Sequence, residues 1–127
     1  METALEETIR PVKWIGSSLE ALRALDQQVK DEFGFAIYQA QCGSRHIHAK
    51  PMKAMAGAVV EVVENYRGNT FRAVYTVQFA EAVYVLHVFQ KKSKSGIATP
   101  KHDIDLIQRR FKIAKETHDQ WKQSHHR

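Results

Sequence analysis

The sequence has a single cysteine, three prolines and six glycines among its 127 residues. One cysteine can form neither an internal disulfide nor a thiolate zinc site, so we interpret Cys42 as an ordinary small side chain. No run approaches the roughly 18 consecutive apolar residues of a membrane-spanning helix, and the first residues do not resemble a signal peptide. Glycine-rich phosphate-binding motifs and the G-x-S-x-G motif are also missing. We therefore expect a cytoplasmic protein with no membrane partner and no local signature of nucleotide or serine hydrolysis.

The chain does contain enough apolar surface for one domain, together with an excess of positive charge. Hydrophobic residues make up 43% of the chain. This content and length predict a single domain over residues 1–127, with a frayed tail from about residue 120. Nineteen Lys and Arg against fourteen Asp and Glu give a net charge of +5, concentrated between Lys91 and Lys112. Such a charge favours a polyanionic partner.

Hydrophobic periodicity predicts the element order βααβββα and an α+β fold whose sheet is mostly antiparallel. The expected elements are a strand over 10–15, a helix from about residue 17, a second helix ending near residue 43, three strands over 58–92 and a helix from about residue 100 to the end. Ser17 and Thr99 are expected to cap the first and last helices. Residues 44–57 show no sustained period and predict a basic loop.

Two side chains in the predicted strands are candidates for chemistry. Arg72 lies within an apolar strand, where its charge requires either a structural ion pair or an anion-binding cleft. His87 lies in the apolar run VYVLHVF, and strict alternation places it on the same face as Val85 and Phe89. It is either a core histidine or a group that transfers protons near neutral pH. The residues alone leave both choices open.

Five lysines follow the predicted strands or precede them in the basic loop: Lys50, Lys53, Lys91, Lys92 and Lys94. If the two loops meet at one end of the sheet, these cations form a phosphate-binding pocket; otherwise they are a solvated patch. Phe89, beside them, either stacks on an RNA base or belongs to the core.

The histidines do not provide a convincing set of metal ligands. His46 and His48 form an H-x-H pair that can bind metal weakly, but no acidic residue or cysteine completes a tetrahedral site by its spacing in the sequence. We therefore expect neither a metal nor a cofactor.

The run from Lys50 to Ile107 contains KPMKAMAG, VVEVV, YRGNTFRAVYTV, AVYVLHVFQKKSKSGIATP and DIDLI. It resembles the RelE/ParE toxin superfamily, and within it the phage Gp49-like, HigB-type toxins. The resemblance covers more than half of the chain, and a strand followed by two helices is the matching upstream layout. It implies a RelE-like fold and the toxin of a type II toxin-antitoxin system, neutralised by an antitoxin that is usually a small helix-turn-helix protein.

The resemblance also implies an activity. Most relatives of this kind are ribosome-dependent endoribonucleases that cut mRNA without a metal, through attack of the ribose 2′-hydroxyl on the adjacent phosphorus. By the same resemblance, Arg72 contacts the scissile phosphate and Lys91 and Lys92 act beside it. Lys50 and Lys53 match a basic RNA-binding loop. A histidine near the last strand moves the proton in some relatives, which makes His87 the candidate here.

The sequence departs from the family pattern at Val63, where relatives often carry an arginine two residues after the glutamate that is Glu61 here. Arg67 or Lys53 is the candidate replacement for the missing cation. Two alternatives remain: a ParE-like inhibitor of DNA gyrase, and an RNA-binding member without catalytic activity. An open cleft containing Arg72 and the lysines at the end of the last strand is expected only for the nuclease.

Overall fold

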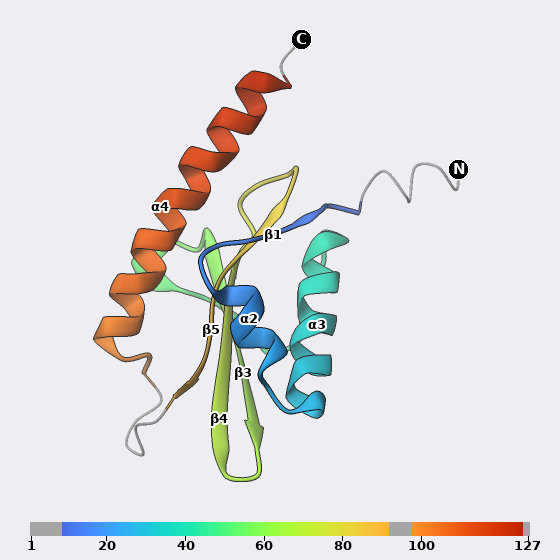
Figure 1. The fold of residues 1–127 in the computed structure, drawn as a ribbon, viewed down its shortest axis with the longest axis vertical. Coiled ribbons are helices and arrows are strands. Elements are labelled where there is room, and N and C mark those ends of the chain that lie inside the picture. The colour runs from blue at the N-terminus through green and yellow to red at the C-terminus, as the bar shows by residue number, and fades with distance from the viewer. Residues whose placement is uncertain (1–8, 92–97, 126–127) are drawn as a thin grey trace.

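The computed structural model describes residues 9–91 and 98–125 and contains one five-stranded sheet with the order β1-β5-β4-β3-β2 (Figure 1). Its strands are β1 (Val12–Trp14), β2 (Ala49–Pro51), β3 (Val59–Tyr66), β4 (Asn69–Thr76) and β5 (Val83–Lys91). β1 pairs with β5 in parallel, and the other three pairings are antiparallel. The predicted α+β class, the mostly antiparallel sheet and the three-stranded meander are thus confirmed.

The region expected to be a loop is more regular than predicted. Residues 49–51 form the edge strand β2, and Lys53–Met55 form the 3₁₀ helix η1. The strand is only three residues long and ends in a proline, so its residues carry little periodic signal of their own. Its regularity comes from pairing with β3, where Lys50 lies opposite Glu61.

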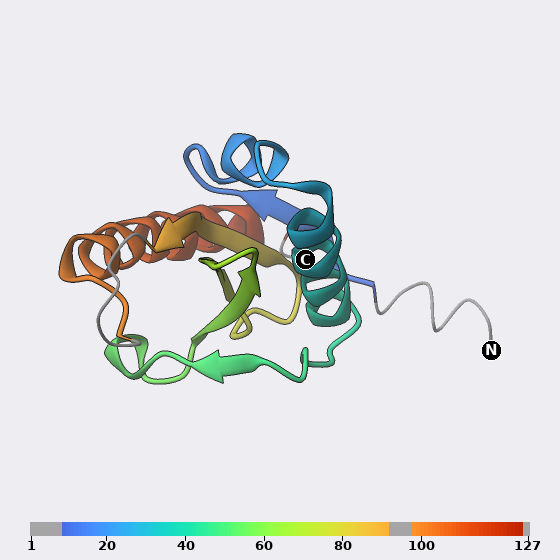
Figure 2. The same ribbon diagram turned by 90° about the horizontal axis from the view of Figure 1, so that it is seen from below.

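Helices cover both faces of the sheet (Figure 2). Helices α2 (Ser18–Arg23) and α3 (Gln27–Gln41) pack on one face around Phe33. Helix α4 (Lys101–Ser124) packs on the other face through Ile107 and Phe111, and it extends into the region expected to be a frayed tail. Side chains alternate between the two faces along β4. Phe71, Ala73 and Tyr75 therefore face α3, while Val74 between them faces α4. No helix in the described part of the chain is long and apolar enough to cross a membrane.

The helix caps differ from the prediction. Ser17 precedes α2 but makes no side-chain capping hydrogen bond. Pro100 takes the cap position of α4, and the hydroxyl of Thr99 donates to Glu61 at 2.6 Å instead. Thr99 therefore links the beginning of α4 to β3 and does not cap the helix.

A β-bulge in β5 changes the predicted face of His87. Val74 pairs with His87 and Tyr75 pairs with Val85, so Leu86 is an extra residue in β5. Arg110 of α4 donates to the carbonyl oxygen of Leu86 at 2.8 Å, which satisfies the acceptor at this irregularity. As a result, His87 faces α4, whereas strict alternation had placed it with Val85 on the opposite face.

Candidate active site on the α4 face

Arg72 is buried in the middle of the sheet and takes part in an ion pair. Its guanidinium Nη1 lies 2.9 Å from Glu61 Oε1 and 3.4 Å from Thr99 Oγ1. The Arg72 side chain is 5% exposed and that of Glu61 is 12% exposed. Of the two roles left open for Arg72, structural pairing is therefore present in this structure. Glu61 and Thr99 were not predicted as its partners.

His87 lies one strand away and is held by a carboxylate from α4. Its Nε2 is 2.8 Å from Asp103 Oδ1, and its ring stacks on Phe89 with the centroids 4.2 Å apart. A carboxylate accepts the Nε2 proton, which leaves Nδ1 as the acceptor of the neutral ring. Burial lowers the pKa of His87 below its usual value of 6.5, and the opposing effect of Asp103 does not reverse this. The histidine is therefore neutral at physiological pH and can accept a proton.

Asp103 was missed by the sequence analysis, although a signal was present. It lies four residues before Ile107 on the buried stripe of α4 and is itself buried. A carboxylate on such a stripe requires a hydrogen-bonding partner, and His87 supplies it.

The sheet register brings the candidate side chains together. Phe89 lies directly opposite Arg72, and His87 and Lys91 are its diagonal neighbours on β5. Diagonal neighbours in an antiparallel pair are about 7–8 Å apart, a separation that one phosphodiester and its ribose can bridge. Lys91 is buried at the end of β5. Lys92 and Lys94 lie outside the described residues.

The remaining basic candidates are exposed and lie farther out. Lys50 is opposite Glu61 on β2, so it borders the same face of the sheet. Lys53 lies in η1. Arg67 lies at the tip of the β3–β4 hairpin with a φ of +52°, where its guanidinium is 5.2 Å from the centroid of the Tyr66 ring. It precedes Arg72 by five positions, roughly 16 Å at the usual rise of a strand, so it does not join the central cluster.

Val63, the position at which the resemblance led us to expect an arginine, lies directly opposite Arg72. The missing cation would therefore have been the cross-strand neighbour of Arg72. Neither Arg67 nor Lys53 occupies that place.

The chain matches the family described as Phage derived protein Gp49-like (DUF891) over residues 20–112. It belongs to this family, since the match spans most of the chain and includes all of the sheet except β1. No curated protein and no solved structure matches the chain significantly. The family is associated with RelE-like toxins, so membership suggests the toxin of a toxin-antitoxin system with an antitoxin as its partner.

Proposed function

We propose that this protein is a type II toxin that cleaves mRNA on the ribosome, as a metal-independent endoribonuclease. The observation that supports it is the grouping of Arg72, Phe89, His87 and Lys91 on one face of β4 and β5. The family association supports the toxin class, and the residue types in this group supply the chemistry.

In the proposed reaction, Nδ1 of His87 accepts the proton of the ribose 2′-hydroxyl while its oxygen attacks the adjacent phosphorus. The bond to the 5′-oxygen breaks, and Lys91 donates the proton that this oxygen needs. Arg72 stabilises the charge that develops on the phosphate oxygens, a contribution typically worth about 3–4 kcal/mol. The products are a 2′,3′-cyclic phosphate and a 5′-hydroxyl.

Substrate binding in this proposal requires a local rearrangement. Arg72 is paired with Glu61, and Thr99 at the beginning of α4 contacts both residues. A substrate phosphate replaces the Glu61 carboxylate beside Arg72, and Phe89 stacks on a neighbouring base. Of the lysines predicted from the sequence to bind RNA, Lys50 borders this position on β2 and Lys53 follows it in η1, where both can contact the RNA backbone.

Primer extension on a defined mRNA in a reconstituted translation reaction tests the proposal. His87→Gln is the informative variant, because the glutamine amide can still donate to Asp103 but cannot act as a base. We expect cleavage within ribosome-occupied codons to fall about 100-fold or more, since general acid–base catalysis contributes about 10²- to 10⁴-fold. His102→Gln is the matched control, because this exposed histidine lies 3.2 Å from the other oxygen of Asp103. Its cleavage rate should stay within about threefold of wild type.

The second candidate is a gyrase inhibitor. The burial of Arg72 and Lys91 favours it, because the nuclease requires an open cleft around these cations. Growth arrest on expression with intact mRNA, together with loss of gyrase supercoiling in the presence of the protein, would establish this candidate instead. Intact mRNA without growth arrest would indicate an inactive member that binds RNA.

The salt dependence of RNA affinity shows whether the positive charge of the protein contacts the RNA backbone. If about four cations contact single-stranded RNA, the logarithm of affinity should fall against the logarithm of salt concentration with a slope near −3. A flat response would show that the positive charge does not bind RNA. The same charge is complementary to an acidic antitoxin segment, which should compete with RNA for this surface.

A further inference from the structure

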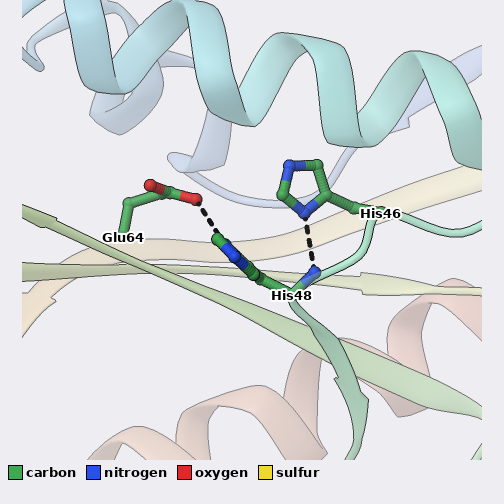
Figure 3. Close-up of side chains that lie close together, drawn as sticks. All are labelled: His46, His48 and Glu64. Carbon is green, nitrogen blue, oxygen red and sulfur yellow. Dashed lines mark hydrogen bonds and ion pairs between the residues drawn. The ribbon is translucent and has the colours of Figure 1, made fainter.

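A second group of chemically competent side chains lies on the opposite face of the sheet, next to β2. His46 and His48 belong to the loop between α3 and β2, and Glu64 lies near the end of β3 (Figure 3). One possible ligand atom from each of the three residues lies within 4.8 Å of the others. Glu64 is two residues beyond Val62, which packs toward α3, so this group is on the other side of the sheet from Arg72. It plays no part in the proposed nuclease.

His46 is held in the tautomer that a metal ligand needs. Its Nε2 contacts the carboxylate of Glu32 on α3, and its Nδ1 accepts a hydrogen bond from the backbone N–H of His48 at 3.0 Å. The Nε2 proton therefore belongs to the contact with Glu32, and the lone pair is on Nδ1. A carboxylate that binds the far nitrogen of a histidine is the usual outer-shell partner in metal sites. The His46 side chain is 2% exposed, so packing fixes the ring in this orientation.

His48 and Glu64 already have the separation of two ligands on one metal ion. Nδ1 of His48 lies 3.2 Å from Oε1 of Glu64. Ligands at about 2.0–2.1 Å from a tetrahedral Zn²⁺ are about 3.3 Å apart, so an ion fits between these two atoms without moving either residue far. The rings of His46 and His48 meet edge to face with centroids 5.2 Å apart, and Figure 3 shows Nδ1 of His46 on the side toward His48.

We propose that His46, His48 and Glu64 bind one Zn²⁺ ion, with Glu32 orienting His46 from behind. Two imidazoles and one carboxylate are a ligand set that zinc accepts, and the fourth position is open to water. On binding, the ion replaces the backbone N–H of His48 as the partner of the Nδ1 lone pair of His46. It fixes the α3–β2 loop to β3 and thereby holds the short edge strand β2 in place. The sequence did not reveal this site because Glu64 is sixteen residues from His48 and reaches it only through the pairing of β2 with β3.

Titration of metal-free protein with ZnCl₂ in a calorimeter tests the site. Wild type should bind one equivalent of Zn²⁺ saturably. His48→Ala should weaken binding by more than the roughly 10- to 100-fold that loss of an outer-shell partner costs, and Glu32→Gln should fall within that range. The His48 side chain is 57% exposed, so the alanine variant is expected to fold, which circular dichroism checks. Glu64→Gln is a second ligand variant.

The histidines at the C-terminus provide the matched control. A variant with His125→Ala and His126→Ala also removes two histidines, which are adjacent in the sequence, but should keep the full affinity. Zinc should also raise the melting temperature of this control and of wild type, but not that of His48→Ala at the same concentration. The proposal is wrong if His48→Ala binds zinc as tightly as wild type, if the tail variant loses binding, or if no saturable binding occurs below about 1 mM.

Discussion

The buried pair of Arg72 and Glu61 makes a sharp prediction about stability. Their side chains are 5% and 12% exposed and lie 2.9 Å apart. Arg72→Ala leaves the Glu61 carboxylate as an uncompensated buried charge, which typically costs about 3–5 kcal/mol. A domain of this size has only about 5–15 kcal/mol of stability, so we expect the melting temperature to fall by about 10–20 °C.

A double-mutant cycle isolates the pair from the rest of the protein. Glu61→Leu with Arg72→Met removes both charges and fills most of the volume, so the double variant should be within about 1 kcal/mol of wild type or more stable. Each single substitution leaves a buried charge unpaired and the double variant does not, so the coupling energy, measured from urea unfolding curves, should be at least about 2 kcal/mol. The exposed pair of Lys101 and Asp105, 3.1 Å apart, is the matched control and should give about 0.3–0.5 kcal/mol.

Additivity would refute this reasoning. If the changes in the free energy of unfolding caused by the two single substitutions add up to that of the double variant within about 0.5 kcal/mol, the two charges do not stabilise each other. The result also decides how toxicity is tested. A loss of toxicity in Arg72→Ala reports catalysis only if the variant is still folded at the growth temperature, whereas the double variant removes the guanidinium without leaving a buried charge unpaired.

Three further predictions concern substitutions at single residues. Burial keeps the pKa of His87 below its unfolded value, so the unfolded chain takes up the proton first as the pH falls below about 6.5, and wild type loses stability there. His87→Gln removes this loss, and its melting temperature relative to wild type should rise between about pH 8 and about pH 5. The Tyr75 hydroxyl is buried without a hydrogen-bond partner among the described residues, and burial raises the pKa of Tyr75 to about 12. Tyr75→Phe should therefore change the free energy of unfolding by less than about 1 kcal/mol at neutral pH and reduce the loss of stability above about pH 10; a larger destabilisation at neutral pH would show that the hydroxyl is hydrogen-bonded. Gly16 has a φ of +58°, and a Cβ there would lie 2.9 Å from the Arg110 guanidinium, so Gly16→Ala should cost about 1–2 kcal/mol in urea unfolding. Gly34→Ala, with nothing within 4 Å inside α3, should instead stabilise by about 0.5–1 kcal/mol, and equal effects at the two glycines would contradict the argument.

The sequence predicted the helices and the long strands because their periodicity is set by their own residues. It did not predict β2, whose three residues become a strand only through pairing with β3. It also misplaced His87, because a bulge depends on how two strands fit together and leaves no trace in the alternation of one strand. Local patterns therefore determined the order of the elements, and contacts between elements determined the details.

The same distinction applies to the candidate site. An arginine in an apolar strand showed that Arg72 requires a partner, but several acidic residues were available and the sequence did not identify Glu61. Asp103 was identifiable as a buried acid but not as the partner of His87. Pairings of this kind depend on register and helix placement, which are set by packing over the whole sheet.

The beginning of α4 connects the two halves of the proposed site. Thr99 contacts both Arg72 and Glu61 just before the helix starts, and Asp103 in the first helical turn binds His87. A shift of this turn away from the sheet would break the contacts of Thr99 and of Asp103 together, because the two residues are separated by only one turn of chain. Loss of the Thr99 contact with Arg72 and release of the His87 ring would therefore be a single structural event. An antitoxin that keeps this turn on the sheet would block phosphate binding and proton transfer at once, without contacting either Arg72 or His87.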